Sequence, residues 1–211
     1  MKITAPKVRY RPIVETDEAA IGEILADWNH DNINAHRGNR FDSVRLTNTV
    51  NRWLLDASVE PPEIPLKTSS LFRQALLMYM DATSVIDSPP DKETPVGLVV
   101  FVARGKTIKV ELTAIHPSYR GKKLYSEFYP TLSKYAFVTL GADDITWQIP
   151  TNVAAGKHAT SKWDGFTTAA GQTTGETGAR DNYSITKTQW QARLDDASGK
   201  EFKDLDYAFT A

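Results

Sequence analysis

Apolar residues recur along the chain with two different spacings, and these spacings predict strands and helices in alternation. Short apolar or alternating runs bounded by turn residues are typical of strands. The runs are residues 8–14, 71–82, 96–104, 107–115 and 144–149. A tight connection at residues 104–107 predicts a hairpin. Two further strands are expected on either side of the Gly- and Thr-rich residues 171–178, the second near residues 182–189.

Residues spaced three or four apart predict two helices in the first third of the chain. The apolar face of the first comprises Ile21, Ile24, Leu25 and Trp28. We expect Thr16 to be its N-cap, because a hydroxyl can accept from the exposed N–H groups of a first turn. The apolar stripe of the second, near residues 43–57, comprises Leu46, Val50, Trp53 and Leu54. Residues 60–65 are expected to form a loop, because prolines disfavour both helices and ladders.

A third helix is predicted over residues 121–140. Its apolar face comprises Leu124, Phe128, Leu132 and Tyr135. Pro130 predicts a kink or a break inside this helix, and Gly141 is suited to its C-cap. A short helix is expected over residues 152–163, and residues 193–205 are expected to be a helix or a loose tail.

Strands and helices alternate throughout, without an internal repeat or a long linker. This order predicts an α/β or α+β fold with a single domain over residues 1–211, in which residues 191–211 form a C-terminal helix or tail. The strands at residues 107–115 and 144–149 should be parallel, because a crossover helix connects them. We therefore expect a mixed, twisted sheet flanked by helices.

Composition narrows the function classes. The chain has 211 residues, a formal net charge of -1 and no cysteine. A charge near zero gives no global field for nucleic acid or a membrane surface, so neither is expected as a partner. The absence of cysteine excludes a disulfide framework, a thiolate zinc site and a cysteine nucleophile. No apolar stretch has the length of a signal peptide or membrane span, which predicts a cytoplasmic protein, either a monomer or a homodimer.

The most informative segment follows the strand at residues 107–115. Arg120, Lys122 and Lys123 place up to three positive charges where a helix is expected to start. The first N–H groups of a helix have no intrahelical partner, and Gly121 allows a ligand to approach the backbone closely. The segment therefore predicts an anion site, although an ordinary turn with solvated basic residues has the same composition.

Four segments, in this order, resemble the Gcn5-related N-acetyltransferase (GNAT) family. Residues 11–17 resemble its opening strand and turn, with an Arg-Pro step followed by Asp, and residues 96–100 resemble the strand that begins with a Val-Gly pair. Residues 116–124 resemble the acetyl-CoA pyrophosphate loop, and Asn152 with residues 162–166 resembles the helix ending in Gly-Phe beside the pantetheine arm. The resemblance implies a GNAT-like sheet whose strands splay apart at the cofactor site.

This chain departs from the family pattern at three positions. Ser118 stands where the loop motif usually has Arg or Gln, and Lys123 stands at its final Gly or Ala position. Ser161 stands where the family often carries a Tyr that donates a proton.

The resemblance implies acetyl-CoA as the cofactor. The residues that it places in the cofactor site are Thr113, Ala114, Ile115, Ser118, Tyr119, Arg120, Gly121, Lys122, Lys123, Leu124, Tyr125, Asn152 and Lys157. Among these, Ala114 and Ile115 would provide the backbone donor for the thioester carbonyl. Asn152 would be a helix cap that also binds the pantetheine amide, or a cap alone. Lys157, with Lys162, would reach the nucleotide's 3′-phosphate, or be solvated.

Acyl transfer to an amine requires a group that removes the amine proton. Glu111 is the first candidate, directly or through water, because its strand should face the acetyl group; the alternative is an ion-paired strand carboxylate. His116 is the next candidate, and its alternative is a turn residue beside the phosphates. Ser161 could hydrogen-bond the thiol sulfur, or be a helix spacer.

The only His/Asp cluster comprises Asp27, His30, Asp31 and His36. Its spacing lacks a regular pair of metal ligands, so no metal is expected. The resemblance places His30, Asp31 and His36 beside the acceptor site, where an acidic and aromatic loop would suit a cationic amine. The alternative is that these residues form a solvated connection. The chain is therefore expected to transfer an acetyl group from acetyl-CoA to a primary amine of a small molecule or protein by direct attack. The alternatives are a non-catalytic GNAT-fold protein that binds CoA or acts as a scaffold, and a different fold with a simple phosphate site.

Overall fold

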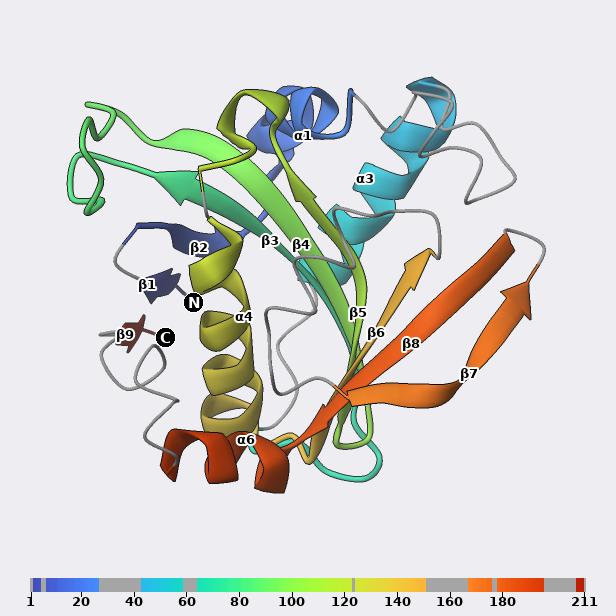
Figure 1. Cartoon of the computed structure of the whole chain (residues 1–211). Helices are drawn as coiled ribbons and strands as arrows, with labels where there is room; N and C mark the ends of the chain where they lie inside the picture. Colours follow the sequence, from blue (N-terminus) through green and yellow to red (C-terminus); the bar gives the residue numbers. More distant parts are fainter. Residues whose placement is uncertain are drawn as a thin grey trace.

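The computed structural model describes residues 2–4, 7–26, 43–58, 64–122, 124–150, 167–175, 178–195 and 208–210. Their strands form one sheet of nine, in the order β7-β8-β6-β5-β4-β3-β2-β1-β9 (Figure 1). The strands are β1 (Lys2–Thr4), β2 (Arg9–Pro12), β3 (Leu71–Met80), β4 (Thr94–Arg104), β5 (Thr107–Ile115), β6 (Asp144–Pro150), β7 (Thr167–Gly175), β8 (Gly178–Thr186) and β9 (Ala208–Thr210).

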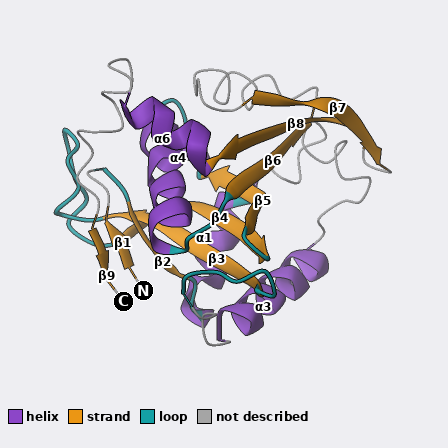
Figure 2. Cartoon of the chain, turned by 90° about the horizontal axis from the view of Figure 1, so that it is seen from below, coloured by secondary structure: helices purple, strands orange, loops and turns teal. Residues whose placement is uncertain are grey.

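Helices cover both faces of this sheet (Figure 2). They are the 3-10 turns η1 (Glu15–Asp17) and η3 (Pro117–Tyr119), the helices α1 (Glu18–Ile24), α3 (Ser43–Ser58), α4 (Tyr125–Lys134) and α6 (Lys187–Asp195), and the π-helical turn η4 (Tyr135–Thr139). α1 and α3 lie on one face, and α4 and α6 lie on the other. The predicted mixed sheet with flanking helices is confirmed.

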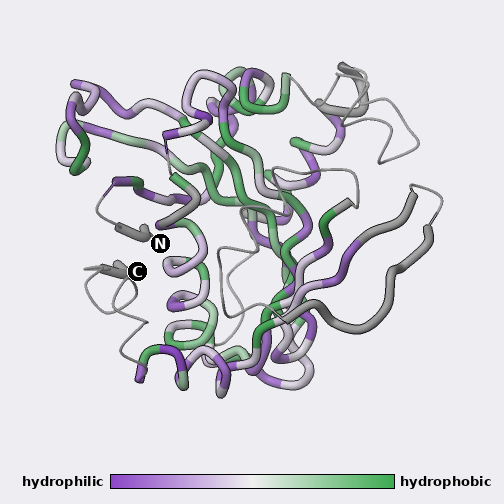
Figure 3. The backbone as a smooth tube through the Cα atoms, in the orientation of Figure 1, coloured by the Kyte–Doolittle hydropathy of each residue, from purple (hydrophilic) through white to green (hydrophobic). Residues whose placement is uncertain are grey.

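The central strands are apolar on both faces because each face packs under helices. In β3, Leu76 and Met78 belong to the core under α4, whereas Ala75 and Leu77 belong to the core under α1 and α3. Figure 3 shows the apolar positions concentrated along β3, β4 and β5. The apolar faces predicted for the helices are confirmed where their side chains are described, with Ile21 and Trp53 buried against the sheet. Trp28 and the side chain of Leu46 lie outside the described part of the chain.

The pair of β5 and β6 is parallel, whereas the other strand pairs that the structure describes are antiparallel. Its register joins Thr107 to Asp144 at one end and Val110 to Trp147 at the other. Beyond Val110, β5 continues to Ile115 without a partner residue on β6, and the two strands diverge (Figure 1). The predicted parallel pairing and splay are both confirmed.

Several predicted boundaries are wrong, for tertiary reasons. β7 occupies most of the Gly- and Thr-rich segment that was expected to be a turn, because it pairs with β8 along its length. α6 begins at Lys187, inside the last predicted strand. β1 and β9, which the pattern did not predict, add two short strands at the edge.

Three local predictions about helix ends have different outcomes. Thr16 is not a cap but lies within η1, because Asp17 accepts from the Val14 N–H at 2.8 Å and starts the turn earlier. α4 does not end at Pro130 but runs through it to Lys134. The capping role of Gly141 is confirmed, since its φ is 68°. Within the described ranges, no helix combines the length and apolar character needed to cross a bilayer.

Candidate cofactor and active site

The loop after β5 is one 3-10 turn followed by a left-handed glycine. His116 caps η3, and its Nδ1 accepts from the Ser118 N–H at 3.2 Å. Gly121 has a φ of 76°, which glycine adopts without strain. A left-handed residue cannot continue into an α-helix, so α4 begins at Tyr125 with Leu124 as its N-cap. The predicted helix start at Gly121 is therefore wrong by one turn, and Gly121 belongs to the loop.

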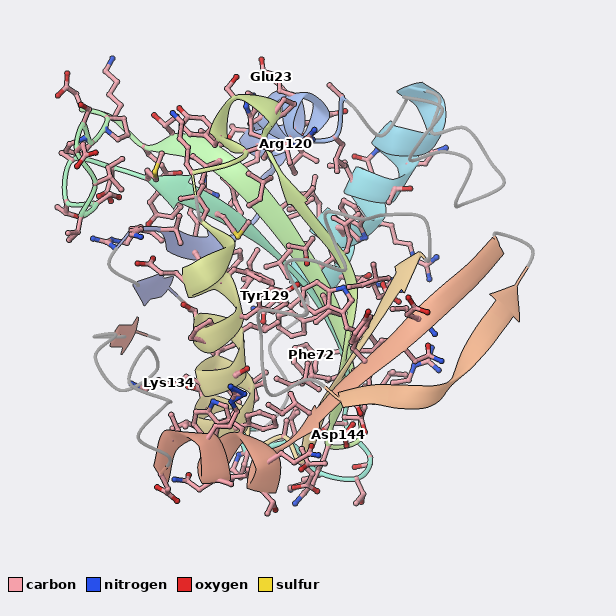
Figure 4. All side chains as sticks on the ribbon, in the orientation of Figure 1. Glu23, Phe72, Arg120, Tyr129, Lys134 and Asp144 are labelled. Carbon is pink, nitrogen blue, oxygen red and sulfur yellow. The ribbon has the colours of Figure 1, made fainter. Side chains whose placement is uncertain are left out.

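This loop is basic and open to solvent. The Arg120 Nε donates to the Ile115 carbonyl at 3.0 Å, which holds the guanidinium at the end of β5. The Lys122 Nζ lies 5.2 Å from the centre of the Tyr119 ring, within the range of a cation–π contact. A Cβ placed on Gly121 would meet no atom within 4 Å, so a ligand has room beside its backbone. The residues present therefore fit an anionic group. Figure 4 shows Arg120 and Glu23 at the same end of the sheet.

The N-terminus of α4 is fixed beside the point where β5 and β6 part. Trp147 is the last β6 residue paired with β5. Its ring packs against Phe128 at 5.7 Å and Tyr129 at 4.9 Å between ring centres, and both residues belong to the first half of α4. Tyr129 points from α4 toward the sheet (Figure 4). The first half of α4 and the point where β5 and β6 separate therefore lie side by side.

The β5 backbone presents alternate residues to the splay. The His116 N–H donates to the Val96 carbonyl at 2.9 Å, and the ladder pairs Ala114 with Leu98. In an antiparallel ladder, bonding toward one neighbour alternates along the strand. Ala114 therefore bonds toward β4, whereas the N–H groups of Thr113 and Ile115 face the splay. This geometry favours Thr113 and Ile115 over Ala114 as donors to a bound carbonyl.

Glu111 is the extra residue of a β-bulge. Val100 is paired with Leu112 and Phe101 with Val110, which leaves Glu111 between them without a partner on β4. Glu111 is also the first β5 residue beyond the paired part of β6. The bulge therefore lies at the point where the two strands separate.

The Glu111 carboxylate is part of an ion-pair array on the α3 side of the sheet. Its Oε2 accepts from the Arg73 Nε at 3.1 Å, and the Arg73 Nη1 donates to the Asp56 Oδ2 at 2.9 Å. The Glu111 side chain is 33% exposed. The ion-paired alternative thus describes its contacts in the structure, and a role as base stays a prediction.

His116 lies between the loop and α1. Its Nε2 is 3.8 Å from Glu23 Oε2, and its ring is 5.6 Å from that of Tyr119. With Nδ1 already accepting from Ser118, its contacts are those of a turn residue beside the phosphate loop. A role as base is again a prediction.

The remaining predicted site residues lie outside the described part of the chain. They are His30, Asp31, His36, Lys123, Asn152, Lys157 and Ser161. Tyr125 is described as the first residue of α4. The acceptor site and the pantetheine-side helix therefore stay predictions.

Sequence reasoning missed Arg73, which holds Glu111, and Asp56, which holds Arg73. Arg73 is the one charged residue of a mostly apolar strand, which is a detectable signal, but its partners depend on the packing of α3. The structure also gives a steric reason for Gly97 in the Val-Gly pair. A Cβ there would lie 2.3 Å from Met78 Cε and 2.7 Å from the Ala114 carbonyl, so only glycine fits.

Comparison with known proteins supports this geometry. No family model matches the sequence, and no curated protein matches it significantly. Among solved structures, a spermidine N-acetyltransferase from Vibrio cholerae in complex with CoA and spermine aligns with a TM-score of 0.61 and 14% identity, over 88% of this chain and 98% of that one. An acetyltransferase of the GNAT family from Bacillus anthracis aligns with a TM-score of 0.61 and 16% identity, over 89% of this chain and 99% of that one.

The two aligned structures cover most of the chain, and their identities are low enough that the likeness establishes the fold alone. The chain has the fold of the Gcn5-related N-acetyltransferases.

Proposed function

We propose that the protein is an acetyl-CoA-dependent N-acetyltransferase that moves an acetyl group to a primary amine by direct attack. The observation that carries the proposal is the splay of β5 and β6 beyond Val110 and Trp147, with a basic loop at its mouth. The Vibrio cholerae protein that shares this fold is described as a spermidine N-acetyltransferase and was solved with CoA and spermine. A cationic amine is therefore a reasonable acceptor class.

The proposed reaction assigns three tasks to the residues of the site. When bound, acetyl-CoA supplies a thioester whose carbon–sulfur bond breaks as the amine nitrogen forms a bond to the acetyl carbon. Arg120, Lys122 and the Gly121 backbone would hold its phosphates. The N–H of Thr113 or the N–H of Ile115 would donate to the acetyl oxygen and stabilise the negative charge that develops there.

The third task is removal of the amine proton. Glu111, through a water molecule, is the proposed acceptor, because it stands at the bulge where the strands separate. The carboxylate lies on the α3 side with Arg73, so a water molecule would carry the proton from the bound amine to it. The contacts of Glu111 also favour a second candidate function, a non-catalytic protein that binds CoA or acts as a scaffold.

The cofactor part of the proposal is tested by calorimetry at Gly121. Wild type should bind acetyl-CoA with a dissociation constant in the micromolar range, roughly that of a nucleotide ligand held by amides and two or three cations. Gly121→Asp should abolish binding, because it adds a negative charge where the phosphates bind. Gly121→Asn is the matched control, since it has the same shape and the same backbone strain without the charge. Equal affinity of the two variants would contradict the proposed phosphate site.

Catalysis is tested separately, by CoA release in the presence of amines. A panel of polyamines, aminoglycosides and peptides with free amino groups should contain an acceptor that releases CoA in proportion to enzyme. Binding of acetyl-CoA without release for any amine would favour the non-catalytic alternative. The same panel is screened with Gly121→Asp, and any CoA release that persists in this variant does not depend on the proposed phosphate site.

A further inference from the structure

Thr113 carries a buried hydroxyl that has no hydrogen-bond partner among the described residues. Buried side-chain hydroxyls in native proteins nearly always have a partner, because an unpaired one loses its bonds to water without compensation. Valine has nearly the same shape as threonine and would fill this position without that penalty. The hydroxyl therefore needs an explanation other than packing.

The position of Thr113 supplies one. It lies on β5 beyond the last residue paired with β6, and its backbone N–H faces the splay. Its ladder partner Val99 belongs to the core under α4, so the Thr113 side chain is on the α4 side of the sheet. The unpaired hydroxyl is thus next to the open edge of β5 and on the side from which α4 borders the site.

A second threonine on the same strand lies where β5 and β6 are paired, and its hydroxyl has a hydrogen-bond partner. Thr107, at the start of β5, is the ladder partner of Asp144 on β6. The Thr107 Oγ1 lies 3.0 Å from the Asp144 Oδ1 and is hydrogen-bonded to it. The threonine beside the closed part of the sheet has its partner on β6, whereas the threonine beside the splay has none in the part of the chain that the structure describes.

We propose that the Thr113 hydroxyl hydrogen-bonds the acyl-bearing arm of acetyl-CoA in the splay. The arm contains amide and thioester carbonyls that accept and amide N–H groups that donate, and a hydroxyl can serve either kind. Together with the Thr113 and Ile115 N–H groups, it makes the β5 edge a row of polar contacts for the arm. This inference rests on the proposed function and adds a side chain that selects the arm rather than the nucleotide.

The test compares two ligands that differ in the arm. Acetyl-CoA contains it, and adenosine 3′,5′-bisphosphate has the nucleotide phosphates without it. Thr113→Val should weaken acetyl-CoA binding by roughly 3- to 10-fold, the range for one neutral hydrogen bond, and leave the bisphosphate unchanged. Thr113→Ser keeps the hydroxyl and should restore most of the affinity. Calorimetry, or displacement of a fluorescent CoA analogue for the weaker ligand, measures both.

Stability without ligand gives an independent readout. Thr113→Val should unfold at the same or a higher denaturant concentration than wild type, because it removes an unpaired buried hydroxyl. Thr107→Val is the matched control on the same strand. It should unfold at a lower concentration, because it breaks the bond to Asp144, and bind acetyl-CoA with unchanged affinity.

The outcomes separate this inference from the proposed function. Unchanged acetyl-CoA affinity in Thr113→Val, or equal weakening of both ligands, overturns the contact while wild-type binding still supports the proposed function. Failure of wild type to bind acetyl-CoA overturns both. Lower affinity in Thr113→Val together with rescue by Thr113→Ser and unchanged bisphosphate binding supports the contact.

Discussion

Replacing Glu111 by Gln distinguishes two roles of this residue, as an ion-pair partner of Arg73 and as the acceptor of the amine proton. The substitution keeps the size of the side chain and a carbonyl oxygen that can still accept from the Arg73 Nε, now 3.1 Å away. It removes the negative charge and the capacity to take a proton. The two roles therefore predict effects on different observables and of different size.

The ion-pair role predicts a small loss of stability. Glu111 and Arg73 are 33% and 22% exposed, and Arg73 keeps its second partner, Asp56. Solvent-screened pairs of this kind contribute about 0.5–1 kcal/mol to the free energy of unfolding. For a chain of this length that is roughly 1–4 °C in Tm. Thermal unfolding of wild type and variant measures it.

The proton-acceptor role predicts a much larger effect on turnover. Loss of a general base lowers kcat by about 100- to 10,000-fold, which is about 3–5 kcal/mol of activation free energy. The affinity for acetyl-CoA should change little, because the loop at residues 116–122 is untouched. CoA release with both substrates saturating is the assay.

Asp56→Asn is the matched control, since Asp56 is the other carboxylate bound to Arg73. It should reproduce the small loss of stability and leave kcat within a factor of two or three, about the uncertainty of such comparisons. Near-normal kcat in Glu111→Gln, with the acceptor saturating, would refute the role of Glu111 as base. The proton would then pass to water, and His116 would be the next residue to replace.

Three further predictions concern the surrounding structure. Gly97→Ala should lower the free energy of unfolding by about 1–3 kcal/mol in a denaturant titration, because the new Cβ would lie 2.7 Å from the Ala114 carbonyl. Burial raises the pKa of Asp17, but the bonds from Arg11 and from a backbone N–H outweigh it and hold the pKa below its usual 3.8. Asp17 should therefore stabilise the fold above pH 3.8 and lose this contribution on further acidification, and Asp17→Asn should reduce that acid dependence. Burial raises the pKa of Glu127 above its usual 4.5. The contribution of Glu127 to the free energy of unfolding should be present below pH 4.5 and lost as pH rises through the pKa of Glu127 in the folded protein. Urea titrations of Glu127→Gln should not show this loss.

The elements predicted most accurately from the sequence are the strands that are buried on both faces of the sheet. β3, β4 and β5 carry long apolar runs because helices cover both faces of the sheet, and their predicted ends agree with the structure to within two residues. The hairpin between β4 and β5 was predictable because Gly105 supplies the left-handed residue that a tight turn needs. The parallel pairing followed from the crossover through α4.

The boundaries of β7 and α4 depend on contacts that local composition does not contain. β7 is rich in Gly and Thr, which is typical of turns, yet it becomes a strand because β8 offers it a ladder. The start of α4 depends on the left-handed φ of Gly121, which the preceding 3-10 turn imposes. In the site, the basic loop was visible in the sequence, whereas the array in which Arg73 binds both Asp56 and Glu111 depends on the packing of α3 on β3.

The bulge at Glu111 explains why the alternation of polar and apolar residues along β5 does not predict which face of the sheet each side chain occupies. Without it, Ile108, Val110, Leu112 and Ala114 would share one face, and Glu111 and Thr113 would share the polar face. The bulge puts Leu112 and Ala114 into the core under α1 and α3, while Ile108 and Val110 stay under α4. One inserted residue reverses every side chain beyond it. Glu111 therefore meets Arg73 on the α3 side, and the hydroxyl of Thr113 becomes buried on the α4 side of the splay. The two residues thus border the opening from opposite faces of the sheet.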